Sequence, residues 1–216
     1  MRFSLVMTDF AWQFNARTNP NTKFGSGMNV YQGMSLKEIL ATAEPINDIC
    51  TENVAIVSWI CSSKADQYFL WLEEMKKFGF RHCSKLFSWI KIAKSNGKPR
   101  ALPGYYSLGA TEDLYLMVRG SLPIVKKGVK QVLDGDFDWV EDTVFTDVCQ
   151  KPHSKKPDSV RGKLVEIFGD VPRIELFARN RNKMQDGWLA VGNEIAPDYL
   201  DIFEALRQIK EDIYLR

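Results

Sequence analysis

The sequence predicts an α/β fold in which helices cover both faces of a sheet. Short apolar segments with the length of buried strands alternate along the chain with amphipathic segments of helical period. The chain has 216 residues, is 45% hydrophobic and 26% charged, and contains no internal repeat or linker-like segment. This length suits one compact domain, so we expect residues 1–216 to form a single domain.

The N-terminal part predicts a buried strand, a long loop and a helix. Arg2–Thr8 is apolar at its centre, as buried strands are. Asp9–Gly33 is polar and rich in Asn, Gly and Thr, and loops of that length in compact domains commonly carry function. Ser35 begins a helix, because Glu38 three residues later completes a capping box.

The central part predicts a strand, a helix and two more strands. Asn53–Cys61 is strongly apolar and is expected to form a buried strand. Over Ser63–Phe78 the apolar side chains recur at helical spacing, and Gly79 can end that helix. Lys85–Ile92 and Glu112–Val118 have the composition of strands.

The C-terminal part predicts two helices with two strands between them. Pro157 can occupy the first turn of a helix that runs to Phe168. Ile174–Ala178 and Trp188–Val191 are expected to be strands. An apolar stripe over Pro197–Tyr214 predicts that residues 195–216 contain a C-terminal amphipathic helix.

Several protein classes are excluded by composition and by missing motifs. The longest apolar run, Val54–Cys61, is far shorter than the roughly 20 residues of a membrane span. The N-terminus lacks the pattern of a secretory signal, so we expect a cytoplasmic protein without membrane contact. The scattered cysteines and the two histidines lack metal spacing, so no metal is expected. Dinucleotide-binding GxGxxG, P-loop and GxSxG motifs are absent.

The first candidate site follows the N-terminal strand. Ligands of open α/β sheets bind beyond the carboxyl ends of the strands, which singles out Asp9. In Thr8-Asp9-Phe10-Ala11-Trp12 a carboxylate precedes an aromatic residue by three positions. Such a pair can hold the exocyclic amine of a base and stack on its ring. The alternative is that Asp9 only ends a strand and that Trp12 fills the core.

Two further candidate sites lie in the C-terminal third. In Ser154–Asp158, Lys156 precedes a helix start, where a cation can meet a carboxylate or phosphate, although the segment can equally be a solvated turn. Ile174–Arg179, Asn182 and Gly187–Glu194 form a strand, a polar loop and a second strand. The polar groups of this unit can hold the ribose hydroxyls and carboxylate of a nucleoside-type cofactor.

Taken together and in this order, these motifs resemble those of the MT-A family of S-adenosylmethionine-dependent N6-adenine methyltransferases. The resemblance runs from about Ser4 to Glu194. Its further matching segments are Tyr31–Ser35, Ser88–Lys91, Glu112–Gly120, Ser154–Asp158, Glu175–Arg179 and Gly187–Glu194. It implies a Rossmann-like methyltransferase sheet with a permuted motif order, in which the amine-binding motif comes first and the cofactor loop last.

One departure from the family concerns the catalytic tetrapeptide, which is D-P-P-W there and Asp9-Phe10-Ala11-Trp12 here. In the family, the Asp carboxylate and the following carbonyl accept hydrogen bonds from the adenine amine. Phe10 still supplies that carbonyl, but the rigidity that proline gives to φ is lost, which weakens pre-organisation. Phe10 can instead add stacking or change which base fits.

The resemblance implies a role for each matching position. The catalytic motif would be Asp9, Phe10, Ala11 and Trp12. The residues that bind S-adenosylmethionine would be Asp9, Lys156, Phe177, Arg179, Arg181, Asn182, Asn193 and Glu194. The residues that bind the substrate would be Trp12, Asn15, Tyr31 and Lys155. Arg181 stands where the family often has a histidine.

The expected function is therefore methylation of adenine N6 in nucleic acid. The family includes the catalytic subunit of the eukaryotic mRNA adenosine methyltransferase, which carries added zinc fingers. DNA is preferred to RNA as the substrate because this chain lacks those zinc fingers. Two alternatives stay open: a catalytically degenerate subunit that binds nucleic acid or cofactor, and methylation of another exocyclic amine such as cytosine N4. A homodimer or a heterodimer is also left open.

The net charge of +2 confines any nucleic-acid contact to a local basic patch. Basic residues gather before and within the helix after Pro157, and we expect them to flank a nucleic-acid groove with the loop Phe14–Gly27. These residues are Lys151, Lys155, Lys156, Arg161 and Lys163. The alternative is a solvated surface.

Overall fold

A computed structural model describes the residues 1–13, 33–91, 99, 109, 111–129, 132–133, 156–157, 159–179, 182–195 and 197–215. The strands are β1 Phe3–Thr8, β2 Cys50–Ile60, β3 Arg81–Ile90, β4 Thr111–Arg119, β5 Val132–Leu133, β6 Arg173–Leu176, β7 Met184–Gln185 and β8 Trp188–Val191. The helices are α1 Leu36–Ala41, α2 Ala43–Asp48, α3 Ala65–Lys76, α4 Ser159–Phe168 and α5 Ile202–Tyr214, and a short 3₁₀ turn, Ser62–Lys64, precedes α3.

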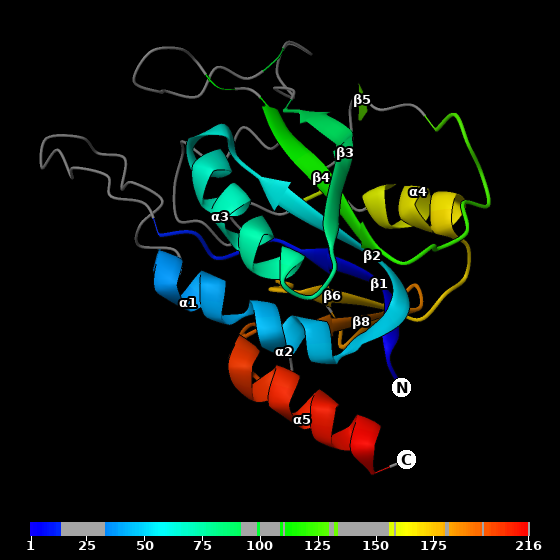
Figure 1. The fold of residues 1–216 in the computed structure, drawn as a ribbon. Coiled ribbons are helices and arrows are strands. Elements are labelled where there is room, and N and C mark those ends of the chain that lie inside the picture. Colours follow the sequence, from blue (N-terminus) through cyan, green and yellow to red (C-terminus); the bar gives the residue numbers. More distant parts are fainter. Residues whose placement is uncertain are drawn as a thin grey trace, which may run out of the picture.

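These strands form one mixed sheet in the order β5-β3-β4-β2-β1-β6-β8-β7 (Figure 1). The central strand β1 is parallel to β2 and to β6, and β6 is parallel to β8. By contrast, β4 is antiparallel to both β2 and β3. The carboxyl ends of β1, β2, β3, β6 and β8 therefore share one edge of the sheet with the first residues of β4.

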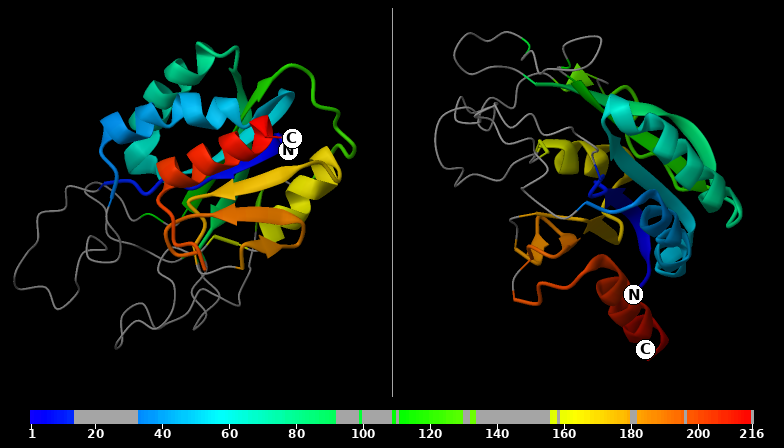
Figure 2. Two further views of the ribbon diagram at one scale, coloured as in Figure 1. Left: turned by 90° about the horizontal axis from the view of Figure 1, so that it is seen from below. Right: turned by 90° about the vertical axis from the view of Figure 1, so that its left-hand side faces the viewer.

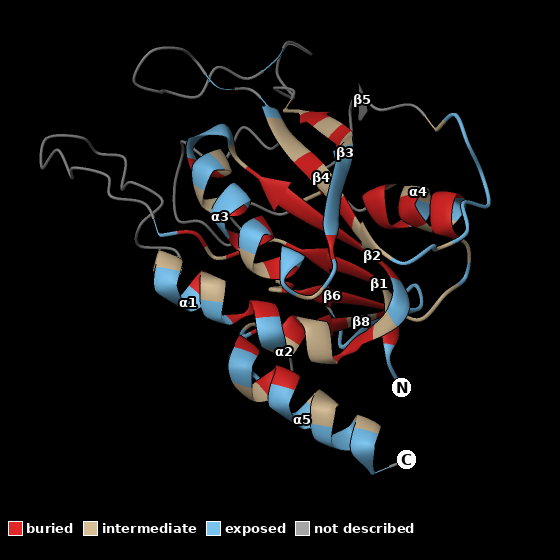
Figure 3. Cartoon of the chain, viewed as in Figure 1, coloured by how far each residue is buried: buried red, intermediate tan, exposed pale blue. Residues whose placement is uncertain are grey.

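Helices cover both faces of this sheet, as the sequence predicts. Side chains of β1 alternate between two apolar layers, because successive residues of a strand point to opposite faces. Val6 packs in the layer of α1, α2, α3 and α5, whereas Leu5 and Met7 pack in the layer of α4. Figure 2 shows α4 on the side opposite to the other helices. Figure 3 shows that the central strands are buried along most of their length.

The start of α1 confirms the predicted capping box. The Ser35 hydroxyl accepts the backbone N–H of Glu38, whose carboxylate accepts the backbone N–H of Ser35. The sequence predicts one helix here, but the structure has two, α1 and α2, with Thr42 between them. Pro45 explains the break, because it has no N–H to donate to the carbonyl of Ala41 one turn earlier.

The C-terminal helix begins later than the sequence predicts. Pro197 is not its first residue, because α5 starts at Ile202. Asp201 is the N-cap, and its Oδ1 accepts the backbone N–H groups of Phe203 and Glu204 at 2.9 and 3.0 Å. Tyr199 has a φ of 47°, which a helix cannot contain. A second unpredicted feature is the short edge strand β7.

Among the described residues, no helix is long and apolar enough to cross a membrane. The same residues contain no cluster of His, Cys, Asp and Glu side chains that fits a metal ion.

Candidate active site

A cavity of about 510 Å³ lies beyond the carboxyl ends of the strands, within the usual volume range of ligand sites. It is lined by residues from several elements that are far apart in the sequence. Asp9–Trp12 follow β1, Phe177 and Arg179 follow β6, and Gly192–Glu194 follow β8. Asp201–Phe203, at the start of α5, complete this part of the wall. The location agrees with the rule for ligands of open α/β sheets.

A network of partly buried charges forms one side of the cavity. Lys156 Nζ lies 2.6 Å from Asp9 Oδ2 and 3.2 Å from Glu112 Oε2. Glu112 also accepts from Lys91 Nζ through Oε1 at 2.6 Å. The Lys156 side chain is only 10% exposed and that of Asp9 is 26% exposed, so this ion pair is partly shielded from solvent. Asp9 Oδ1 has no partner among the described residues and is free to accept a hydrogen bond.

The network shifts the pKa values of its members in opposite directions. Burial raises the pKa of Asp9, although the charge of Lys156 opposes this effect. Burial acts in the same sense on Glu112, but Lys156 and Lys91 outweigh it and hold the pKa of Glu112 below its usual value. Burial would lower the pKa of Lys156, yet Asp9 and Glu112 raise it overall. Lys156 therefore remains a cation at neutral pH.

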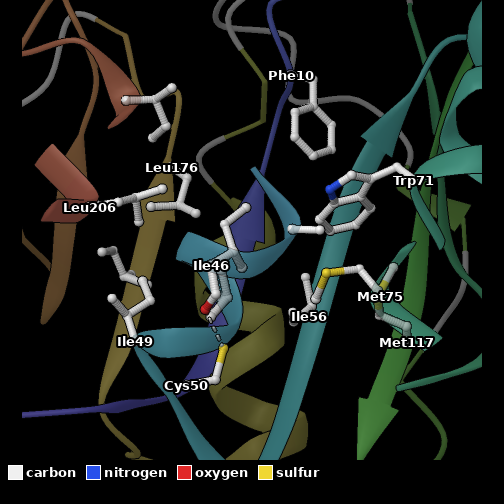
Figure 4. Packing of buried hydrophobic residues seen from close by; sticks show 14 of the residues in the cluster. Phe10, Ile46, Ile49, Cys50, Ile56, Trp71, Met75, Met117, Leu176 and Leu206 are labelled. Atoms are coloured by element: carbon white, nitrogen blue, oxygen red, sulfur yellow. Dashed lines mark hydrogen bonds between the residues drawn. The ribbon is translucent and has the colours of Figure 1, made fainter. Parts of the chain in front are cut away.

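The segment after β1 lines the cavity, and its aromatic residues belong to the core. Phe10 is 2% exposed and Trp12 is 4% exposed. Figure 4 shows the ring of Phe10 beside the indole of Trp71, within the apolar layer. Phe10 therefore does not offer an open stacking face, which is one of the two roles that the sequence left open for it.

The opposite side of the cavity is built where β6 and β8 end. Arg179 Nε donates to Glu194 Oε1 at 2.9 Å, and Arg179 Nη2 forms an ion pair with the same oxygen at 2.8 Å. A Cβ atom at Gly192 would lie 2.3 Å from the carbonyl oxygen of Ala178, so this close approach requires glycine. Asn193 lies on the cavity wall and is exposed.

The cavity brings together most of the site residues that the sequence predicts. Those on its wall are Asp9, Phe10, Ala11, Trp12, Lys156, Phe177, Arg179, Asn193 and Glu194. Asn182 is exposed and does not belong to the wall. The predicted residues Asn15, Tyr31, Lys155 and Arg181 lie outside the described residues.

The predicted basic patch needs a correction. Arg161 is 5% exposed, and its Nε donates to Glu175 Oε2 at 2.9 Å. The prediction that Arg161 faces a nucleic-acid groove is therefore wrong, because its charge is used inside the fold. Lys156 is likewise engaged by Asp9 and Glu112 in the cavity. Lys151 and Lys155 lie outside the described residues, and Lys163 is half-buried on α4.

Sequence reasoning missed several residues of the site. Glu112 and Lys91 belong to the charge network, while Cys61 and Asp201 lie on the cavity wall. The hairpin formed by β3 and β4 is the signal that could have found Glu112. A strand that returns antiparallel to its neighbour begins at the edge where that neighbour ends.

This arrangement agrees with two comparisons with known proteins. A family model described as MT-A70 matches residues 3–194 of the chain. The chain is also 25% identical over 174 residues to the Type II methyltransferase M.MunI of Mycoplasma sp.. That alignment covers 80% of this chain and 63% of the relative, so the chain spans less than two thirds of the relative's length.

Proposed function

The chain belongs to the MT-A70 family, and we propose that it is a methyltransferase that methylates adenine N6 in nucleic acid with S-adenosylmethionine. The observation that carries this proposal is the position of Asp9. Its carboxylate stands at the carboxyl end of the central strand, on the wall of a ligand-sized cavity, and its Oδ1 has no hydrogen bond from the described residues. The preference for DNA over RNA rests on the sequence alone.

The chemistry of the cavity wall fits S-adenosylmethionine. The cofactor carries a carboxylate, an ammonium, a sulfonium, ribose hydroxyls and an apolar purine face. Lys156 is a cation that can meet its carboxylate, and Asn193 and Glu194 can bond its hydroxyls. Ile202 and Phe203 add an apolar surface for the purine on the same wall. When bound, the cofactor supplies a methyl group, which the amine nitrogen accepts as the sulfur–carbon bond breaks and one amine proton is lost.

The residues after β1 have the groups needed to orient an exocyclic amine. The nitrogen lone pair of adenine is delocalised into the ring, so the amine is a poor nucleophile. Asp9 Oδ1 and the carbonyl oxygen of Phe10 can accept its hydrogens and favour a more tetrahedral nitrogen, an interaction strongest in the transition state. The Phe10 carbonyl already accepts the N–H of Trp12 at 2.8 Å, and its second lone pair remains.

Lys156 and Trp12 support this arrangement in different ways. The bond from Lys156 to Asp9 Oδ2 restrains the carboxylate and leaves Oδ1 as the oxygen that would accept from the amine. Trp12 is only 4% exposed, and its ring lies 5.2 Å from that of Phe10, so it supports the turn from the core. It therefore offers no open ring face for the stacking on a base that the resemblance implies.

Two measurements test the proposal. Calorimetry should show S-adenosylmethionine binding one site per chain, and Asn193→Ala should weaken it by about 1–3 kcal/mol, the cost of a lost polar partner. Mass spectrometry of nucleosides, after incubation with DNA or RNA and labelled cofactor, should show N6-methyladenine. N4-methylcytosine as the product would instead support the cytosine alternative. Cofactor binding without any methylated product would support a degenerate subunit, and no binding at all would contradict the methyltransferase assignment.

Mutation of Asp9 tests the mechanism. Asp9→Ala should lower kcat by about a hundred- to a thousandfold, the usual loss when one group that stabilises developing charge is removed. Folding should persist, because Asp9 lies beyond the last residue of β1. Circular dichroism and cofactor calorimetry serve as controls for the fold. A variant that methylates as fast as the parent would show that Asp9 only ends the strand.

A further inference from the structure

We propose that Phe10 and Gly33 are positioning residues that hold Asp9–Trp12 against the cavity. This inference rests on the proposed function, because it concerns the two acceptors that orient the amine. It assigns to Phe10 a role in the core and to Gly33 a role in backbone pairing. Neither role involves contact of these side chains with the substrate.

The segment needs an external support because it has already left the sheet. The last residue of β1 is Thr8, so neither Asp9 nor the Phe10 carbonyl is held by strand pairing. Phe10 and Ala11 also lack the fixed φ of proline. Acceptors at a reacting centre must nevertheless be held closely, since a displacement of about 1 Å can cost on the order of a hundredfold in rate.

The side chain of Phe10 anchors the inner side of the segment. Its ring centroid lies 4.9 Å from Trp71, 5.1 Å from Phe177 and 5.2 Å from Trp12. The interplanar angles of 71°, 55° and 62° are those of tilted and edge-to-face contacts, which aromatic rings prefer. Trp71 is itself fixed, because its Nε1 donates to Thr42 Oγ1 at 3.1 Å. The anchor is therefore a rigid one.

The backbone at Gly33 and Met34 supports the outer side. Met34 N–H donates to the Ala11 carbonyl at 2.6 Å, and Gln13 N–H donates to the Met34 carbonyl at 3.2 Å. A Cβ atom at Gly33 would lie 2.7 Å from Gln13 Cα and 3.0 Å from the Trp12 carbonyl oxygen. Real Cβ contacts are essentially never as short as 2.7 Å, and both neighbours are backbone atoms, which cannot move aside as the end of a flexible side chain can. This pairing consequently depends on glycine at position 33.

The two supports act on the same short turn. Trp12 N–H donates to the Phe10 carbonyl and closes a tight turn over residues 10–12. The aromatic contacts of Phe10 hold this turn at one end, and the backbone bonds to Met34 hold it at the other. Loss of either support should increase the mobility of the Phe10 carbonyl and the Asp9 carboxylate relative to the cavity. Cofactor binding through the ends of β6 and β8 should change little.

The experiment compares Gly33→Ala with the matched control Gly162→Ala, whose added Cβ would meet no atom within 4 Å. Gly33→Ala should lower kcat at least about tenfold, because the amine acceptors move. Its dissociation constant for S-adenosylmethionine should stay near the parent value. Hydrogen exchange should show that the amides of Trp12 and Met34 lose protection. Gly162→Ala should match the parent in every readout.

A second set of variants separates positioning from simple packing at Phe10. Phe10→Ala should lower kcat and expose the same two amides. The double variant Phe10→Pro/Ala11→Pro removes the same ring but restores fixed φ values, so its kcat should exceed that of Phe10→Ala. Phe10→Leu, which keeps apolar bulk, replaces Phe10→Ala if that variant does not fold. A double-proline variant no faster than Phe10→Ala would overturn the positioning role of Phe10.

The outcomes also distinguish this proposal from the proposed function. If the parent methylates nucleic acid and Gly33→Ala retains its kcat and amide protection, the positioning proposal is overturned while the function stands. If the parent binds cofactor but methylates nothing, the function fails. In that case the amide exchange of Gly33→Ala and Phe10→Ala still decides the proposal: loss of protection at Trp12 and Met34 supports it, and unchanged protection overturns it.

Discussion

The protonation of Asp9 should set the acid limit of activity. Its pKa is raised by burial, so protonation begins at a higher pH than for an ordinary aspartate. As the pH falls through that raised pKa, the carboxylate becomes neutral and loses its strength as an acceptor. The charged groups that act on it are Lys156, Glu112 and Arg179.

Removal of Lys156 should move this limit in a defined direction. Lys156→Met deletes the cation that opposes burial, so the pKa of Asp9 rises further and the acid limb of kcat shifts to higher pH. The measurement is kcat against pH at saturating cofactor and substrate. Lys126→Met, which breaks an exposed ion pair with Glu166, is the control. An acid limb that stays in place or moves to lower pH would show that Asp9 is not the limiting group.

The alkylation rates of the cysteines test ligand binding in the cavity without an activity assay. Cys61 lies on the cavity wall, and burial raises its pKa although the Ser63 hydroxyl opposes this. Burial raises the pKa of Cys50 to about 12, so its thiol stays protonated and inert. Cys83 is exposed. Alkylation, followed residue by residue by mass spectrometry, should therefore modify Cys83 first and Cys50 last.

The informative comparison uses the demethylated cofactor product as a ligand. It should slow the alkylation of Cys61 and leave Cys83 unchanged, because Cys61 lines the cavity and Cys83 does not. Cys149, outside the described residues, is followed separately. Equal protection of Cys61 and Cys83 would mean that the ligand acts on the fold as a whole, and no protection of Cys61 would place the ligand elsewhere.

At the scale of elements, local signals predicted starts and stops better than long-range ones. The capping box at Ser35 and the stop at Gly79 are encoded within a few residues, and both are present. Pro197 is acceptable in a first helical turn, but the structure uses Asp201 as the cap instead. Tyr199, between these two residues, has a positive φ that interrupts a helix, and helical periodicity does not reveal such a φ.

The direction of the strands was harder to predict from the sequence than the starts and ends of the helices. The apolar pattern of Glu112–Val118 predicts a strand but says nothing about which way it runs. Because β4 is antiparallel to β2, its first residues face the same edge as Asp9. Glu112 therefore enters the active-site network for a topological reason, which neither composition nor spacing contains.

The N-cap of α5 should affect both stability and cofactor binding. Asp201→Ala leaves the N–H groups of Phe203 and Glu204 unpaired and should cost about 1 kcal/mol of unfolding free energy. It should also weaken S-adenosylmethionine binding, because Asp201–Phe203 line the cavity. Thermal unfolding and calorimetry measure the two effects. Asp201→Asn retains the cap and is the control. Weakened stability with unchanged cofactor affinity would remove α5 from the cofactor site.

At the scale of the whole molecule, sequence gives charges but not their partners. The cavity lies at the predicted edge of the sheet, because the parallel central strands all end at that edge. The predicted basic patch includes two residues that form ion pairs inside the fold. Arg161 of α4 pairs with Glu175 on β6, and Lys156 pairs with Asp9 in the cavity. Such pairings join residues of different elements, and they become visible only in the folded chain.

Salt dependence should reveal how much of the predicted basic patch remains for nucleic acid. Without Arg161 and Lys156, the residues left in the predicted patch are Lys151, Lys155 and Lys163, the first two of which lie outside the described residues. If they supply the phosphate contacts, the logarithm of duplex DNA affinity should fall with the logarithm of salt with a slope of about −2.7, from −0.9 per contact. A slope near −4.5, the value for five contacts, would mean that cations elsewhere contribute.

Single substitutions test this assignment one charge at a time. Lys163→Ala should reduce the magnitude of the slope by about 0.9 and weaken binding at low salt, because one counterion fewer is released. Lys76→Ala is the matched control. Lys76 is the last residue of α3, and α3 starts near the sheet edge that carries the cavity and runs away from it. Arg161→Ala should instead lower the melting temperature, because it leaves Glu175 charged and buried without this partner. A slope unchanged by Lys163→Ala, or lowered equally by Lys76→Ala, would show that nucleic acid does not bind along α4.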